Sequence, residues 1–199
     1  MIRTTRSGTV FVVGFVLLFM ASAAAASGFM KYDGVAGEAK GPDGDNNWFP
    51  LDSFSFGIER EMKESGEKGG TADINIGVGE LQECTISKSM DRTSADLAQY
   101  AINGNSLGMC QICLSDSVDA SGVPNCYAHY VMDRCYVRSW KTSSDAGDRP
   151  TEEVAFYYNK IAFATDDIDP AAGMNWDRRK KRPWPDGLDW LFDFGPGTR

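Results

Sequence analysis

The chain has 199 residues, of which 42% are hydrophobic and 24% are charged, and its formal net charge is −8. This length and composition are typical of one folded domain with extensions. The acidic balance argues against a nucleic-acid-binding protein, because the phosphates would be repelled. The 21 glycines lie largely between short apolar runs, which favours many turns and therefore β structure.

The first 26 residues have the pattern of a secretory signal peptide. Arg3 and Arg6 form a basic start, and the apolar run 10–20 is too short for a comfortable membrane span. Small residues follow, with Ala24 and Ala26 at the positions that precede a cleavage site. One alternative is an uncleaved membrane anchor. Another is translation that begins at Met30, which we disfavour because it would remove the start of a strand expected from Phe29. We expect an exported bacterial protein, periplasmic or extracellular, that does not contact the membrane after cleavage.

The chain after this segment begins with short strands. Alternation of apolar and polar residues predicts strands at 29–35, 48–58, 72–78 and 81–88. In the second of these, Ser53 and Ser55 lie on one face, which we expect to meet water. Phe54 and Phe56 lie on the other face and belong in the core. Residues 60–70 are charged and rich in glycine, which indicates a solvated loop or a long hairpin arm.

One helix is expected, over residues 95–104 with the sequence ADLAQYAING. Thr93 or Ser94 can cap its start, and the pair Asn103-Gly104 ends it. Strands resume at 107–115, 126–140 and 153–165. About seven strands with one helix predict a mainly β fold, a small antiparallel β-barrel, closed or nearly closed, with one flanking α-helix.

Five cysteines are present, so at least one thiol is free or pairs between chains. Cys110 and Cys113 form a C-x-x-C motif, but the surrounding residues are typical of a strand, in which residues three apart point to opposite faces. A redox motif would need a helix N-terminus. A zinc site would need a second close pair, which Cys126 and Cys135 do not provide. We predict a cross-strand disulfide between Cys113 and Cys126, which lie nearly opposite each other if their strands form a hairpin.

The residues after 176 differ in character from the rest. Residues 178–182, RRKKR, are either a solvated linker or a contact with an acidic neighbour. The aromatic tail that follows is too apolar for a spacer, and it either folds onto its own barrel or docks on a neighbouring subunit. Its docking candidates are Trp184, Trp190 and Phe192. The expected divisions are a signal peptide at 1–26, a barrel domain at 27–176 and a basic and aromatic extension at 177–199.

The sequence shows no pattern of catalytic or cofactor-binding residues. His129 is the only histidine, and no nucleophile elbow, P-loop, dinucleotide fingerprint or H-E-x-x-H motif is present. Asp43, Asp45 and Asn47 resemble the start of a calcium loop, but its glycine and its final glutamate are missing. We therefore expect no enzyme activity, no cofactor and no bound metal. A secreted hydrolase would need convergent polar groups that the sequence does not show.

Four segments, in this order, carry a family resemblance: FMKYDGVAGEAK at 29–40, WFPLDSFSFGIER at 48–60, CTISKSMDRTSADLAQYAINGNSL at 84–107 and PTEEVAFYYNKIAFAT at 150–165. The first resembles F-L-K-x-D-G-I-x-G-E-S of the haemolysin-coregulated protein (Hcp) family of type VI secretion. The others resemble that family's second strand, its strand-to-helix stretch and its late strand. Each motif alone is weak, and together they are fairly specific over roughly residues 29–176.

The resemblance implies a structural subunit. In the family six copies form a ring with a wide channel, and the rings stack into a tube that lies inside a contractile sheath, carries a spike and holds small effectors. The implied partners are copies of the chain itself, in addition to spike or effector proteins. Ser53, Ser55 and Gly57 match the strand that borders the lumen. The loop that contacts adjacent rings corresponds to Glu61, Lys63, Glu64, Glu67 and Lys68.

Two features depart from the family pattern. Tube proteins of this family normally assemble in the cytoplasm and lack a signal peptide, and the cysteines and the aromatic tail of this chain are extra. One hypothesis is that disulfides between subunits replace the sheath as a source of stability. The alternative function is a monomeric exported β-barrel binding module that uses its aromatic C-terminal tail.

Overall fold

The computed structural model describes residues 28–60, 62–64, 74–76, 79–165 and 173–184, so the expected signal peptide lies outside the described residues. The described strands are β1 (Gly28–Tyr32), β2 (Phe49–Leu51), β3 (Ser53–Ser55), β4 (Ile58–Glu59), β5 (Met62–Glu64), β6 (Ile74–Ile76), β7 (Glu80–Leu81), β8 (Cys84–Ser89), β9 (Ser106–Val118), β10 (Pro124–Ser143), β11 (Thr151–Tyr157), β12 (Lys160–Thr165) and β13 (Met174–Asp177). The described helix is α1 (Ser94–Asn103). The expectation of a mainly β fold with one helix is confirmed.

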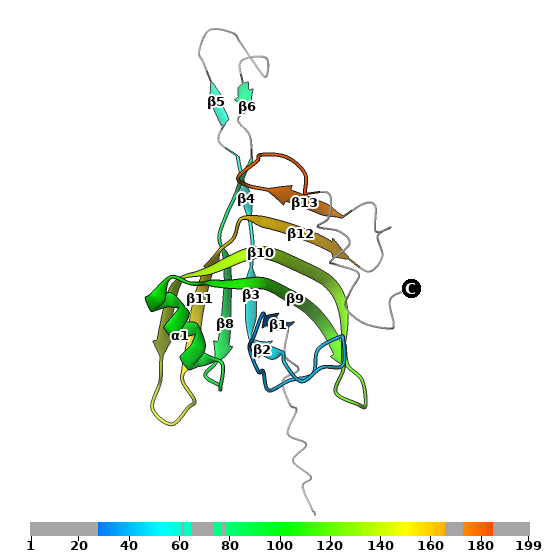
Figure 1. Ribbon diagram of the computed structural model, residues 1–199, viewed down its shortest axis with the longest axis vertical. Coiled ribbons are helices and arrows are strands. Elements are labelled where there is room, and N and C mark those ends of the chain that lie inside the picture. The colour runs from blue at the N-terminus through cyan, green and yellow to red at the C-terminus, as the bar shows by residue number, and fades with distance from the viewer. Residues whose placement is uncertain (1–27, 61, 65–73, 77–78, 166–172, 185–199) are drawn as a thin grey trace, which may run out of the picture.

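Nine strands form one antiparallel sheet in the order β2-β1-β9-β10-β11-β8-β3, with β12 paired to β10 and β13 paired to β12. The two ends of this order, β2 and β3, are separated in sequence only by Asp52. β2 pairs with β1, β3 pairs with β8, and the backbone N–H of Asp52 donates to the carbonyl of Ser87 at 2.9 Å. One short segment therefore supplies both end strands of this order, which requires the sheet to curl (Figure 1).

The expectation of one continuous strand over 48–58 is wrong. The segment is divided into β2, β3 and β4, which pair with three different strands. Leu51 is buried and Ser53 is exposed, although residues two apart in one regular strand share a face. The alternation therefore breaks at Asp52, where the chain passes from one edge to the other. Phe54 and Phe56 pack against the main core, as expected.

The expected strand 153–165 is also two strands, β11 and β12, which are interrupted at Tyr158 and Asn159. Both pair with the long strand β10, β12 through residues 128–133 and β11 through residues 136–143. Between these two halves β10 has a register shift, and Arg134 has a φ of 54°. The bend in β10 gives each half its own partner, which is why one apolar run forms two strands.

The charged segment after β4 begins a hairpin arm. β4 pairs with β7, and further out β5 pairs with β6, with Met62 opposite Ile76. Figure 1 shows this arm rising away from the body of the sheet, beyond β13. The hairpin that the glycine-rich charged sequence predicted is present. The strand expected over 81–88 is divided into β7 and β8.

The helix begins and ends as expected, but its start is held differently. Gly104 has a φ of 68° and its N–H donates to the carbonyl of Tyr100, which is the left-handed C-cap that the sequence predicted. Thr93 occupies the N-cap position without a side-chain cap hydrogen bond. Asp91 organises the turn instead, because its Oδ1 accepts from the Thr93 N–H at 2.8 Å and from the Thr93 hydroxyl at 2.7 Å.

The described chain has two apolar clusters. The main cluster contains Met30, Phe49, Ile86, Leu97, Cys110, Met132, Phe156 and their neighbours. The second contains Phe29, Trp48, Cys113, Cys126, Val131, Ala162, Ala164 and Trp184. Because Cys110 belongs to the first and Cys113 to the second, the C-x-x-C residues lie on opposite faces of β9, as the strand period requires.

The backbone requires glycine at two positions of the first family-like segment, 34 and 37. Gly34 has a φ of 81°, in the left-handed region that disfavours side chains. A Cβ at Gly37 would overlap the backbone carbonyl of Trp48, because Ala39 and Trp48 form a β-bridge across this loop. The loop can thus close over the fully buried Trp48 only with glycine at position 37.

Candidate functional site

The candidate lumen strand presents a small polar surface. Ser53 and Ser55 on β3 are exposed, Gly57 is half-buried, and the hydroxyl groups of Ser53 and Ser87 are hydrogen-bonded at 2.6 Å. Phe54, between the serines, packs against Tyr130 with ring centroids 4.7 Å apart. The core therefore anchors one face of the strand and leaves the hydroxyl face open. The exposed side chains of this strand, Ser53 and Ser55, are small and uncharged.

The candidate ring-stacking residues belong to the arm. Lys63 and Glu64 lie on β5, opposite Asn75 and Ile74 of β6. The other three candidates, Glu61, Glu67 and Lys68, lie outside the described residues. The arm is held at its base by β4 and β7, where the Gln82 amide Nε2 donates to Glu59 Oε2 at 3.1 Å. Its described strands extend away from the sheet, where a neighbouring molecule could reach them (Figure 1).

A buried polar cluster joins β8, the start of α1 and β11. The Lys88 ammonium lies 3.2 Å from Glu152 Oε2 and 2.8 Å from Asp91 Oδ1, and Lys88 and Glu152 are both fully buried. The Lys88 ammonium also donates to the hydroxyl of Ser94 at 3.2 Å and to the carbonyl of Ser89 at 3.0 Å. Charge-assisted bonds of this kind offset the cost of removing the lysine from water. The cluster brings two of the family-like segments, 84–107 and 150–165, into contact.

Sequence reasoning missed this cluster, although a signal was present. Lys88 shares the strand face of Cys84 and Ile86, both of which are fully buried. A lysine at the third position of an apolar face indicates a buried charge that needs an acidic partner. The partner itself, Glu152, could not be identified, because it is supplied by a strand 64 residues away.

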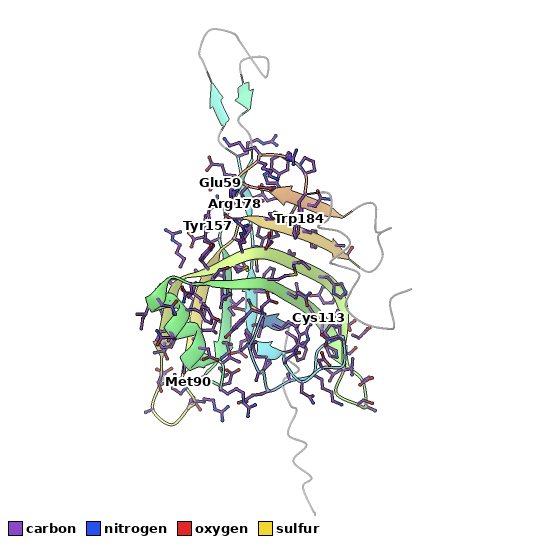
Figure 2. All side chains as sticks on the ribbon, viewed as in Figure 1. Glu59, Met90, Cys113, Tyr157, Arg178 and Trp184 are labelled. Carbon is purple, nitrogen blue, oxygen red and sulfur yellow. A yellow bond between two sulfur atoms is a disulfide. The ribbon has the colours of Figure 1, made fainter. Side chains whose placement is uncertain are left out.

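The structure contains a disulfide between Cys113 and Cys126, with the two Cα atoms 5.5 Å apart. The two residues are diagonal rather than directly opposite, since Cys113 pairs with His129 and Cys126 with Ser115. A register shift between Cys126 and Ala128 accommodates this offset. Both sulfurs belong to the second apolar cluster, near Trp184. The bridge ties β9 to β10 where Figure 2 labels Cys113.

The other cysteines, Cys84, Cys110 and Cys135, are free and fully buried in the main core. All five cysteines are therefore either bonded within the chain or inaccessible. The hypothesis of disulfides between subunits is wrong for this fold, because no cysteine is exposed to a neighbour. Burial raises the pKa of the Cys84 and Cys135 thiols well above the usual range, and the neighbouring Cys110 adds to the effect at Cys135.

We expect the three free thiols to be unreactive in the folded protein. Iodoacetamide at pH 8 should modify none of them natively and all three after denaturation, as counted by mass spectrometry.

The free energy of unfolding should also fall between about pH 8.5 and pH 10, because the unfolded state then loses thiol protons that the folded state keeps. The slope should be roughly 1.4 kcal/mol per pH unit for each of Cys84 and Cys135. Modification of a native thiol, or a flat stability profile over this range, would contradict the prediction.

The basic run 178–182 is a turn packed against the sheet, rather than a solvated linker throughout. The Arg178 guanidinium lies 4.7 Å from the ring centre of Tyr157 and 5.3 Å from that of Tyr158. Figure 2 shows Arg178 beside Tyr157 at the end of the sheet from which the arm rises. The backbone of Asp177 pairs with that of Arg182 and closes the turn. Residues 179–182 are exposed, so their charges face solvent or a partner.

Trp184, the first tail-docking candidate, packs on its own chain. It is 5% exposed, its backbone N–H donates to Asn175 Oδ1 at 3.0 Å, and the Lys160 ammonium lies 4.8 Å from its ring centre. The segment from 177 to 184, which the sequence placed in the extension, therefore contacts the body. The other two candidates, Trp190 and Phe192, lie outside the described residues.

Asp43 and His129, which were considered for metal binding and catalysis, both lie within the folded body of the chain. Asp43 forms an ion pair with Lys31, and its Oδ1 accepts from Trp48 Nε1 at 2.9 Å, which fixes the loop over the buried tryptophan. His129 is 8% exposed on β10. In the described part of the chain, no group of three or more histidine, cysteine, aspartate or glutamate side chains is placed to hold a metal. The helix of this part is too short to cross a membrane.

Solved structures share this architecture over most of the chain. A type six secretion system protein is 21% identical, with a TM-score of 0.68, and the match covers 80% of this chain and 100% of that one. Hcp1 from Salmonella typhimurium is 17% identical, with a TM-score of 0.60 over 79% and 97% of the two chains. The secreted protein Hcp3 from Pseudomonas aeruginosa is 16% identical, with a TM-score of 0.55 over 77% and 98%. A search of curated proteins found no match. These structures define the class of fold: an Hcp-like antiparallel sheet with one helix.

The family model described as "Type VI secretion system effector, Hcp" matches residues 29–164, more than half of the chain. The chain therefore belongs to the Hcp family. It is a tube protein of type VI secretion, a structural subunit and not an enzyme. Hcp family proteins form hexameric rings and are secreted through the type VI system.

Proposed function

We propose that this protein assembles into hexameric rings that stack into a tube, with Ser53, Ser55 and Gly57 lining the lumen and the arm contacting the next ring. The observation that carries the proposal is the family match over residues 29–164, together with the extended arm. The exposed serine face of β3 supports a lumen lining, since small hydroxyl groups let a cargo pass without strong binding. Lys63, Glu64 and their neighbours Glu61, Glu67 and Lys68 supply charges for ring-to-ring contacts.

The specific partners we propose are further copies of the chain, a spike protein at the tip and small effectors in the lumen. A head-to-tail ring closes on itself, so every subunit uses two different surfaces. The fold stabilises each subunit internally through the disulfide and the Lys88 cluster. Ring contacts are thus left to surface loops and sheet edges rather than to cysteines.

The export route is the second part of the proposal: residues 1–26 direct the chain out of the cytoplasm and are then removed. The basic start, the short apolar run and the small residues after it support this route. The disulfide between Cys113 and Cys126 supports an oxidising destination, because such bonds persist outside the reducing cytoplasm.

One preparation tests both parts. After expression of the full-length chain, intact mass should show loss of residues 1–26, and light scattering should give six times the subunit mass. Negative-stain images of that sample should show six-fold rings. A monomer with the correct cleaved mass would reject the ring and retain export, whereas rings of uncleaved cytoplasmic protein would reject export and retain the ring. The alternative binding module would depend on Trp190 and Phe192, because Trp184 is occupied by its own chain.

A further inference from the structure

A small basic hollow lies beside the turn that follows β13. Its volume is about 140 Å³, and it is lined by Arg134, Asn159, Lys160, Asp177, Arg179 and Lys180. These residues come from three places in the chain: the bulge of β10, the corner between β11 and β12, and the turn after β13. Sequence reasoning gave no indication that these places meet.

Backbone hydrogen bonds hold the three places together. The Asn159 N–H donates to the carbonyl of Asp133 at 3.1 Å, and the Arg178 N–H donates to the carbonyl of Asn159 at 2.8 Å. Within the turn, the Lys180 N–H donates to Asp177 Oδ1 at 2.9 Å. The walls of the hollow are therefore set by the folded backbone, and the side chains that line it start from fixed positions.

The net charge around the hollow is positive. Lys160 forms an ion pair with Asp133 at 2.7 Å, and the buried carboxylate of Asp177 is bonded to the turn. The remaining cations, Arg134, Arg179 and Lys180, make no ion pair in the described part of the chain. Four cations against two carboxylates leave a local charge of +2, on a chain whose formal charge is −8.

The backbone of Arg134 is strained. Among the described residues, only Arg134 and Lys181 are non-glycine residues with a positive φ, 54° and 50°, and both belong to this basic end. The left-handed region is costly for a residue with a long side chain. The Arg134 side chain is exposed, so the core does not require it. Glycine would suit the backbone better, and strain of this kind is typical of a functional position.

We propose that this hollow binds the phosphate group of a ligand. The guanidinium groups of Arg134 and Arg179 offer paired donors that match phosphate oxygens, and Lys180 adds a third positive charge. A doubly charged phosphate balances the local charge of +2. The residues that line the hollow come from a single chain, so we expect the monomer itself to bind phosphate.

The test is calorimetric titration of the purified full-chain protein with inorganic phosphate at low ionic strength, where such contacts are strongest. We expect saturable binding of one phosphate per chain, weakened about tenfold or more in Arg134→Gly and in Arg179→Ala/Lys180→Ala. Arg134→Gly should also unfold at a higher denaturant concentration, because glycine relieves the strain. Weaker binding by a more stable protein cannot come from unfolding.

The matched control is Arg149→Ala, which removes one exposed positive charge from the loop between β10 and β11, at the other end of the molecule from β13 (Figure 1). This variant should bind phosphate like the parent protein. Equal weakening by Arg149→Ala, or acetate binding as tight as phosphate, would overturn the proposal.

Glycerol phosphate and vesicles containing phosphatidic acid distinguish the two sources of the phosphate group, a soluble phosphomonoester and a lipid headgroup. Co-sedimentation that Arg134→Gly abolishes identifies a lipid headgroup, and binding of glycerol phosphate without co-sedimentation identifies a soluble phosphomonoester.

Discussion

Replacing Lys88 with methionine will lower the free energy of unfolding by about 3–5 kcal/mol. The substitution keeps most of the side-chain volume but leaves Glu152 and Asp91 in the core without their cation. Carboxylates that stay buried without a partner must either ionise at a high cost or take up protons. Urea unfolding followed by tryptophan fluorescence measures the loss.

The chain offers a closely matched control for this substitution. Lys141 pairs with Glu153, the residue next to Glu152, at 3.3 Å, but these side chains are 70% and 59% exposed. Lys141→Met should therefore cost less than about 1 kcal/mol. In the double variant Lys88→Met/Glu152→Met part of the loss should return, since apolar side chains can replace a buried pair. Equal losses in Lys88→Met and Lys141→Met would show that the buried cluster contributes no more to the free energy of unfolding than the exposed ion pair does.

The elements of this fold could be predicted more reliably than their interruptions. Alternation of apolar and polar residues identified most strands, and the pair Asn103-Gly104 identified the end of the helix. Both signals are local in the sequence. The breaks at Asp52 and at Tyr158 are set by a change of partner strand, which no local pattern records. The same reasoning applies to Arg134, whose positive φ depends on the bulge in β10.

The candidate surfaces depended on the family resemblance, and for a physical reason. An assembly surface is completed by another copy, so its residues have no special chemistry within one chain. Ser53 and Ser55 are ordinary exposed serines until a ring places them on a lumen. By contrast, the Lys88 cluster is complete within the chain, and the position of a lysine on a buried face was a signal that sequence reasoning could have used.

The disulfide should account for the second-largest loss of stability. Replacing both Cys113 and Cys126 with alanine should lower the free energy of unfolding by about 3 kcal/mol, the value expected when a loop of this length is no longer closed in the unfolded chain. Reduction of the parent protein by dithiothreitol should produce a similar loss, and the double alanine variant should not respond to the reductant. The responses should differ in this way because the other three cysteines are free thiols in the native protein.

Because of its place in the fold, the disulfide should also affect the packing of the C-terminal segment on the sheet. Its sulfurs belong to the apolar cluster that holds Trp184, so loss of the bridge should loosen the contact between the sheet and the segment 177–184. Protease cleavage after the basic residues 178–182 should then become faster in the alanine variant than in the parent. Unchanged cleavage together with the full loss of stability would mean that the bridge acts on the unfolded chain alone. Unchanged stability would mean that the bridge does not form in the native protein, because a closed loop of this size must restrict the unfolded state.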